Sequence, residues 1–266
     1  RAVALHVHLR DVSRVVQGVL QIVPAKVADT EAFVRLWAHE TSRVFCDRLV
    51  NNKDRAWFRE RIVETVNGEL FGLSWEPDML STLVFGSYTN TSSGLAGMVY
   101  EELEVAKSAA KFDEYLADYN LASTKPMNLV FFTDACLHLA RLSRVITQPR
   151  GCALMVGVGG SGRQSLARLT ASMWEMKCMG IEVTGKYDMA AWRDDLKTFM
   201  FAAGCDNKPV VFLFSDTQIV KESMVEDVNN ILNSGEVPNL FETEDMERIM
   251  GAVRPLAKEA GKGEGR

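Results

Sequence analysis

The feature that most constrains the fold is a glycine-rich run that follows an apolar stretch. It begins at Gly157 and carries the letters GVGGSGRQS. A phosphate-binding loop is written G-x-x-x-x-G-K-[ST], and Gly157 and Gly162 match its glycine positions. Arg163 takes the lysine position and Gln164 takes the hydroxyl position. The backbone of a phosphate cradle is therefore expected here, with two of its side chains changed.

Apolar and helical segments alternate around this run. Strands are expected at residues 153–156, 181–183 and 210–214, and helices at residues 162–179, 189–202 and 221–233. This alternation predicts a parallel sheet with helices on its faces, where ligands bind at the carboxyl ends of the strands. The loops that follow Val156 and Phe214 are therefore the expected places for a site. A last helix is expected to reach residue 260.

The first part of the chain predicts helices without a strand. Apolar residues from Val12 to Leu20 recur at helical spacing, a second helix follows Asp29 and Thr30, and a third carries its apolar face to Leu70. Four aromatic residues at helical spacing are expected in the core: Phe33, Trp37, Phe45 and Trp57. Residues 72–98 predict a connector with one short strand near residues 82–85. Further helices are expected at residues 100–119 and 128–147.

Composition excludes several functional classes. The chain has 266 residues, 47% of them hydrophobic, and a net charge of -5, so it can bury a full core and has no basic surface for nucleic acid. No stretch approaches the roughly 20 apolar residues that cross a bilayer, so no membrane partner is expected.

Five scattered cysteines are expected as free thiols, and His6 and His8 lack a third metal ligand. The start at Arg1, without Met, suggests a piece of a longer protein.

Two other interpretations of the glycine run are open. The same letters satisfy the dinucleotide pattern G-x-G-x-x-G, with Glu182 placed where such a fold holds a ribose hydroxyl. A purely structural glycine turn is the other. The phosphate loop is favoured by the cation at Arg163 and by the helix before the first strand. The strand from Val210 also favours it, because it ends in Ser215 and Asp216 like the acid-tipped strand of P-loop enzymes.

Several segments together resemble the fourth AAA+ module of a dynein heavy chain. They are Pro149-Arg150-Gly151, GVGGSGRQSLARL from Gly157, VFLFSDTQI from Val211 and NNILNSGEVPNLF from Asn229. The Arg-Gln-Ser and Asp-Thr-Gln variants resemble the axonemal, ciliary branch of that family. LRDVSRVVQG from Leu9 resembles the helical lid of the third module.

The resemblance implies an α/β fold, with an AAA+ P-loop parallel sheet flanked by helices after an all-helical lid subdomain. It implies a lid of the preceding module at residues 1–75, a connector with a helix at 76–125 and a truncated large α/β subdomain at 126–266. The implied function is that of an ATP-driven microtubule motor in the cytoskeleton of the ciliary or flagellar axoneme. Its implied partners are neighbouring AAA+ modules, other dynein subunits and, through absent parts of the chain, microtubules. The alternative is a stand-alone P-loop or dinucleotide-binding enzyme.

By the same resemblance, ten consecutive residues would contact ATP or ADP: Gly157, Val158, Gly159, Gly160, Ser161, Gly162, Arg163, Gln164, Ser165 and Leu166. Arg10 would be the lid arginine that points at the nucleotide of the preceding module. Mg²⁺ has Ser165 and Asp216 as its candidate ligands.

The acid pair that such modules use for hydrolysis is incomplete. The family pattern ends its second strand in Asp-Glu, where the Asp supports Mg²⁺ and the Glu polarises water. Here the pair is Ser215 and Asp216, and either register of the alignment leaves a single carboxylate. Asp216 is therefore the one catalytic candidate. We predict weak hydrolysis or none, in a regulatory or structural nucleotide site, and leave open whether this segment is itself an enzyme.

Overall fold

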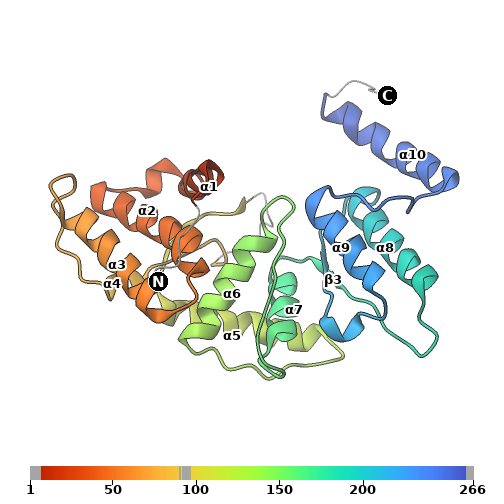
Figure 1. Cartoon of the computed structure of the whole chain (residues 1–266), viewed down its shortest axis with the longest axis horizontal. Helices are drawn as coiled ribbons and strands as arrows, with labels where there is room; N and C mark the ends of the chain where they lie inside the picture. The colour runs from red at the N-terminus through yellow and green to blue at the C-terminus, as the bar shows by residue number, and fades with distance from the viewer. Residues whose placement is uncertain (1–6, 90, 92–96, 262–266) are drawn as a thin grey trace. The chain divides into compact units, whose positions relative to one another are not determined.

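The structure is a computed structural model that describes residues 7–89, 91 and 97–261. The chain divides into two compact units, residues 1–144 and residues 145–266, and helices are the main elements of both (Figure 1). The division expected from the sequence, with boundaries at residues 75 and 125, stays a prediction.

The first unit combines helices with one short pair of strands. Its elements are α1 (Leu9–Val19), a 3-10 turn (Pro24–Lys26), α2 (Thr30–Phe45), a second 3-10 turn (Cys46–Arg48), α3 (Asn52–Asn67), α4 (Met79–Thr82), β1 (Val84–Gly86), β2 (Glu101–Leu103), α5 (Val105–Ala122) and α6 (Thr133–Ile146). The strands are antiparallel, with Val84 opposite Leu103. The short strand expected near residues 82–85 is thus present. Its partner β2 takes residues expected as helix, because pairing with β1 is a long-range contact that local pattern does not reveal.

Side-chain caps fix the start of two helices, and the first of these starts, after Asp29, is the one that the sequence predicts. Asp29 Oδ1 accepts the N–H of Ala32 at 2.8 Å before α2, and Asn51 Oδ1 accepts the N–H of Asp54 at 2.8 Å before α3. A cap of this kind stabilises a helix by about 1 kcal/mol, because the first N–H groups have no partner within the helix. The third helix ends earlier than expected, at Asn67, so Leu70 lies outside it and is exposed.

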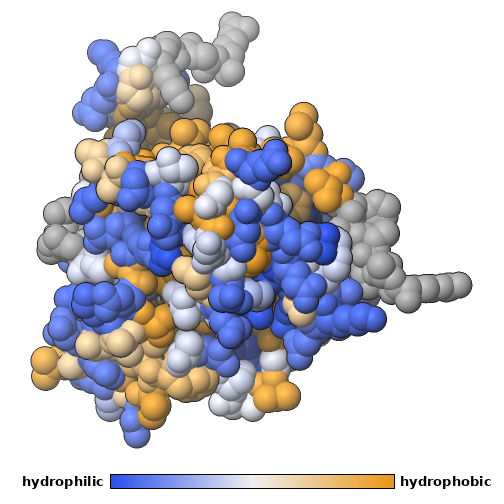
Figure 2. All heavy atoms as spheres, turned by 90° about the vertical axis from the view of Figure 1, so that its left-hand side faces the viewer, coloured by the Kyte–Doolittle hydropathy of each residue, from blue (hydrophilic) through white to orange (hydrophobic). Residues whose placement is uncertain are grey.

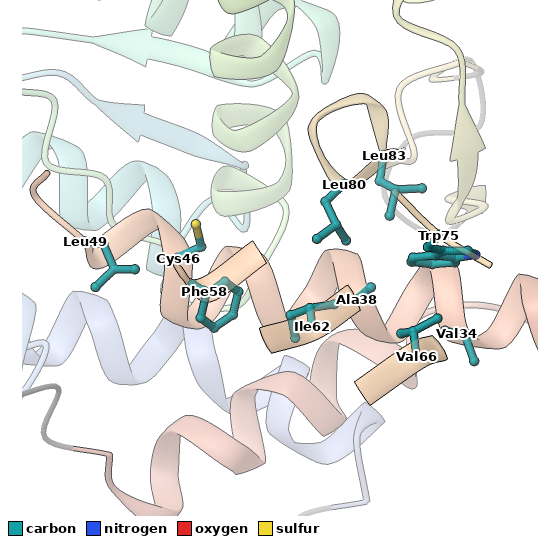
Figure 3. Packing of buried hydrophobic residues seen from close by; sticks show 10 residues of the cluster. All are labelled: Val34, Ala38, Cys46, Leu49, Phe58, Ile62, Val66, Trp75, Leu80 and Leu83. Carbon is teal, nitrogen blue, oxygen red and sulfur yellow. The ribbon is translucent and has the colours of Figure 1, made fainter. Parts of the chain in front are cut away.

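A single apolar cluster joins α2, α3 and the segment that follows α3 (Figure 3). Figure 3 shows side chains of the three segments facing one another across a common interior. Its buried members are Val34, Ala38, Cys46, Leu49, Phe58, Ile62, Val66, Trp75, Leu80 and Leu83. Full burial of one large apolar side chain contributes roughly 1.5–3 kcal/mol, so this cluster is a major source of stability in the first unit.

Two of the four aromatic residues expected in the core lie at the surface instead. Phe33 and Trp57 are 41% and 54% exposed, whereas Trp37 and Phe45 pack against the cluster. The expectation fails because helical spacing identifies a face of a helix but does not say how far a neighbour covers it. Figure 2 shows apolar residues scattered among hydrophilic ones on the face that it presents.

A buried carboxylate, Glu40 of α2, connects four elements of the first unit. Its side chain is fully buried and accepts the Tyr100 hydroxyl at 2.6 Å, the two terminal nitrogens of Arg144 at 2.9 Å each, and Arg43 Nε at 3.0 Å. The carboxylate lies against Gly18 of α1, where an added Cβ would be 1.9 Å from Glu40 Oε2. Glycine is therefore required at this helix crossing, because any side chain would displace the carboxylate. The buried Glu40 carboxylate therefore accepts hydrogen bonds from two arginines and a tyrosine hydroxyl.

His39, next to Glu40, is held in its neutral form. It lines a cavity of about 370 Å³, and its Nδ1 lies 3.2 Å from the carbonyl oxygen of Leu83, which accepts the Nδ1 proton. Burial is the main cause that lowers the pKa of His39 to about 4, with Arg144 and Arg43 acting in the same direction against Glu40. The imidazole therefore has no charge at neutral pH.

The second unit contains the parallel strands and the glycine-rich loop. Its elements are α7 (Arg163–Met173), β3 (Lys177–Met179), α8 (Met189–Gly204), β4 (Val210–Phe212), a 3-10 turn (Asp216–Gln218), α9 (Glu222–Asn233) and α10 (Thr243–Glu259). The two strands are parallel, with Cys178 opposite Val211. The predicted α/β class, with a parallel sheet after a helical part, is confirmed.

Two expected strands differ from the structure. Residues 153–156 form no strand, and Leu154 and Val156 are 92% and 85% exposed, because no described strand pairs with them. The strand expected at residues 181–183 lies at β3 instead. It moves because α7 ends at Met173, where Glu175 has a φ of 53° and the N–H of Met176 bonds back to Ala171 at 2.9 Å. These features end the helix at Met173, whereas the sequence predicted a helix to residue 179, so the extended segment of β3 begins earlier than expected.

The core of the second unit lies among α8, α9 and the two strands. Its buried members are Ile181, Trp192, Leu196, Phe199, Met224, Val237 and Leu240. Trp192 is fully buried and donates its indole N–H to Asp227 Oδ2 at 2.9 Å. Because Asp227 is also buried, this hydrogen bond satisfies the one polar atom of the tryptophan and fixes α8 against α9.

We predict that Glu40→Gln lowers the free energy of unfolding of the first unit by about 3–5 kcal/mol, because it leaves the Arg144 guanidinium buried without its counter-charge. Urea titration followed by hydrogen exchange in α2 and α6 would measure this. The matched control is Asp47→Asn, which removes the exposed partner of Arg141 (3.0 Å) and should cost less than about 1 kcal/mol. Equal losses in the two variants would contradict a special role for Glu40.

A second prediction concerns the pH dependence that His39 imposes. Its folded-state pKa of about 4 lies below the unfolded value of about 6.5, so the unfolded chain binds the proton first as the pH falls. The stability that neutral His39 provides is complete above pH 6.5, decreases on the order of 2–3 kcal/mol towards pH 4 and then levels off. Urea midpoints at pH 7, 5 and 4 should show this decrease in wild type and in His138→Gln, an exposed control. The same decrease in His39→Gln would refute the assignment.

Candidate nucleotide-binding site

The glycine-rich loop forms an open turn directly before α7. Gly160 and Gly162 both have a φ of 76°, and Gly162 is the N-cap of the helix. This left-handed conformation favours glycine, which explains why the sequence places it at these positions. Gly162 has no side chain to cap the helix. Among the described residues, no protein acceptor takes the N–H groups of Arg163, Gln164 and Ser165.

These free N–H groups make the loop suitable for an anion. They lie at the positive end of the α7 dipole, so a phosphate oxygen placed there would receive hydrogen bonds and a favourable field. The turn is open, since an added Cβ at Gly159, Gly160 or Gly162 would meet nothing within 4 Å. The residues present therefore fit the phosphates of a nucleotide. Leu166 differs from its neighbours, because it is buried and its N–H bonds to Gly162 at 2.9 Å.

The cation in the lysine position is turned towards the loop itself. Arg163 Nη2 donates to the carbonyl of Val158 at 3.1 Å, and Nη1 donates to the carbonyl of Met155 at 3.4 Å. Gln164 is exposed and Ser165 is half-buried. The first turn of α7 thus provides a hydroxyl at Ser165, one position beyond the expected place. Magnesium coordination by Ser165 stays a prediction.

The turn after β4 holds its polar residues in a local network. Ser215 and Gln218 form a capping box, in which Gln218 Oε1 accepts the N–H of Ser215 at 2.8 Å. Gln218 Nε2 donates to the carbonyl of Ile181 at 2.6 Å and so connects this turn to the segment after β3. Sequence reasoning missed this role of Gln218, although the S-x-x-Q spacing from Ser215 is a readable capping pattern.

Asp216, the one carboxylate of the expected acid pair, is exposed. Its Oδ1 accepts the N–H of Thr217 at 3.0 Å, and Ser215 Oγ lies 3.0 Å from the Thr217 hydroxyl. Both this turn and the glycine loop belong to the second unit. Within the part of the chain that the structure describes, no hydrogen bond or ion pair connects them.

The remaining candidates belong to the first unit. Arg10 is exposed in the first turn of α1, where it makes no hydrogen bond or ion pair with any described residue. His8 is exposed at the N-cap of α1, and His6 lies outside the described residues. No group of three acidic, histidine or cysteine side chains in residues 7–89, 91 and 97–261 could hold a metal ion. No described helix combines the length and apolar character needed to cross a membrane.

Two family models match the chain. One, described as the P-loop containing dynein motor region D4, matches residues 127–266, and another, described as the dynein heavy chain ATPase lid domain, matches residues 6–55. Together with the loop geometry, this match defines the second unit as part of a P-loop nucleotide-binding module of the AAA+ class. The lid match covers α1, α2 and the start of α3, and it confirms the resemblance of this part of the chain to a dynein lid.

Related proteins extend the match along nearly the whole chain. Identity is 44% over 261 residues to dynein axonemal heavy chain 6 of Homo sapiens, 42% over 256 residues to dynein axonemal heavy chain 1 of Mus musculus, and 42% over 265 residues to the dynein-1-beta heavy chain of the flagellar inner arm I1 complex of Chlamydomonas reinhardtii. The alignments cover 97%, 96% and 96% of this chain and 6% of each relative. The chain therefore belongs to the dynein heavy-chain family, as its motifs indicated, and represents a small part of its relatives' length.

We predict that Gly162→Ala destabilises the start of α7 by about 1–2 kcal/mol, because alanine is strained at positive φ. Gly159→Ala is the matched control. It also has open space around the new Cβ but no positive φ, so its effect should stay within about 0.5 kcal/mol. Hydrogen exchange at Leu166 and Leu169 would measure the opening of the helix in each variant. Equal effects would show that backbone conformation at Gly162 is not the constraint.

Proposed function

We propose that residues 157–165 hold a nucleotide, ATP or ADP, in a regulatory or structural role with slow hydrolysis or none. The observation that carries this proposal is the row of free N–H groups at the start of α7 beside two glycines with positive φ. The match to a P-loop module of the dynein motor supports the choice of a nucleotide over other anions. The phosphates of a bound nucleotide would accept hydrogen bonds from these N–H groups, and Mg²⁺ would neutralise part of the phosphate charge.

Slow hydrolysis follows from the side chains that surround the loop. Gln164 replaces the hydroxyl that would bind Mg²⁺, which leaves Ser165 as the candidate ligand on α7. Asp216 is the single carboxylate at the end of β4, and it already accepts a hydrogen bond from Thr217. A water held for attack needs a base within hydrogen-bond reach in addition to a metal partner, and one carboxylate cannot fill both places. The site is therefore suited to holding a nucleotide more than to turning it over.

The activity of the complete protein is also a proposal, because the chain corresponds to 6% of each relative. We infer that it is part of the AAA+ ring of an ATP-driven microtubule motor in the ciliary or flagellar axoneme. Residues 1–75 would be the lid of the preceding module, residues 76–125 the connector and residues 126–266 the large subdomain. Neighbouring AAA+ modules would contact this segment directly, and Arg10 would point at the nucleotide of the preceding one. Other dynein subunits and microtubules would be partners of the complete motor.

Calorimetry with Mg·ATP and Mg·ADP tests whether the loop binds a nucleotide. We expect wild type to bind at least one of them, and Gly159→Glu to bind at least about tenfold more weakly, because its carboxylate would repel the phosphates in an open turn. The matched control is Gly185→Glu, which adds the same charge at another open glycine of the second unit and should bind as wild type does. No binding by wild type would refute occupancy. Equal binding by the two variants would place the site elsewhere.

A turnover measurement on the same samples tests the second half of the proposal. Phosphate release should stay well below about 1 s⁻¹, which is slow among enzymes. Asp216→Asn should leave that low rate nearly unchanged. A rate at or above 1 s⁻¹ that Asp216→Asn abolishes would make this module an active ATPase.

A further inference from the structure

The side chain of Arg163, the first residue of α7, reaches back over the glycine loop that precedes it. Its guanidinium hydrogen-bonds to two carbonyl oxygens, those of Val158 at 3.1 Å and Met155 at 3.4 Å. These carbonyls lie on either side of Gly157. The stem of the arginine passes close to that glycine, since an added Cβ at Gly157 would lie 3.6 Å from Arg163 Cδ. Arg163, the first residue of α7, therefore links the two ends of the segment from Met155 to Val158.

This connection matters because the segment before the loop has little else to hold it. Residues 153–156 pair with no described strand, and the flanking side chains of Leu154 and Val156 are exposed. Inside the loop, the described residues contribute one backbone hydrogen bond, from Ser161 N to the Val158 carbonyl at 3.4 Å, the same length as the contact between Arg163 and Met155. The two hydrogen bonds from Arg163 are thus a large share of the contacts that set the loop conformation.

A guanidinium suits this task better than an ammonium. It is planar and presents several N–H donors in a fixed fork, so two of its nitrogens reach two separate carbonyls at once. A lysine at this position is shorter and ends in a single nitrogen. In the phosphate-loop pattern the lysine reaches the phosphates. The arginine at this position instead reaches the carbonyls of Met155 and Val158.

We propose that Arg163 is a positioning residue that fixes the phosphate loop from within by bridging the Met155 and Val158 carbonyls. Its guanidinium is committed to the backbone and is not the cation that contacts phosphate. The proposal rests on the proposed nucleotide site for its consequence on binding, but the effect on the loop itself is independent of any ligand. Phosphate recognition then falls to the free backbone N–H groups of Arg163, Gln164 and Ser165 and to the helix dipole.

The first test measures loop order without nucleotide. Nitrogen-15 relaxation of the Gly159 and Gly160 amides should give order parameters near about 0.85 in wild type, and below about 0.6 in Arg163→Met and in Arg163→Lys. Arg168→Met and Arg168→Lys are the matched controls, because Arg168 is an exposed arginine of the same helix. These controls should retain the wild-type values. Unchanged order in both Arg163 variants would overturn the proposal.

The second test separates positioning from direct contact with phosphate. We expect Arg163→Lys and Arg163→Met to weaken Mg·ADP binding equally, by about three- to tenfold, with the salt dependence of affinity the same as in wild type. If Arg163 contacts phosphate instead, lysine should rescue binding and methionine should both weaken it and reduce its salt dependence. That pattern would overturn the proposal. If wild type binds no nucleotide, the proposed function fails, and the order parameters still decide the role of Arg163.

Discussion

The first unit depends on one interaction, the burial of the Glu40 carboxylate among its hydrogen-bond donors. A buried charge is tolerated only when paired and fully hydrogen-bonded, and here Arg144, Arg43 and Tyr100 meet that condition together. Gly18 keeps α1 close enough to seal the carboxylate from that side. Because the partners come from α2, α6 and the residue before β2, satisfying one charge fixes the positions of several elements. Glu40, Arg144 and Arg43 also act on the pKa of the neighbouring His39.

In the second unit, the candidate nucleotide site is organised by backbone more than by side chains. The positive φ of Gly160 and Gly162 turns the chain so that α7 begins with its N–H groups open. The side chains that usually add chemistry to such a loop are engaged with the protein, Arg163 with carbonyls and Asp216 with a neighbouring N–H. A site of this kind has the groups needed to hold phosphates and few of those needed to activate water.

Much of the fold was readable from local pattern. The helices α8 and α9 lie within two residues of their predicted bounds, and α2 begins where its cap predicted, since caps, apolar spacing and flanking turns are all local signals. The glycine loop was readable for the same reason. The failures involve partners distant in the chain: β2 pairs with β1, residues 153–156 lack a partner strand, and Phe33 and Trp57 lack a covering neighbour. The Glu40–Arg144 pair could not be predicted at all, because its members are 104 positions apart.

The sequence by itself determined the family, the place of the phosphate loop and the shortage of carboxylates after β4, because each is a matter of residue identity at fixed spacing. Tertiary structure alone decided where the side chains point. Whether Arg163 faces a phosphate or its own loop, and whether Gln218 is free or bonded to Ile181, depends on which acceptors the fold brings within reach. Hydrogen bonds act over about 3 Å, and the spacing of letters in a sequence does not specify distances of that size.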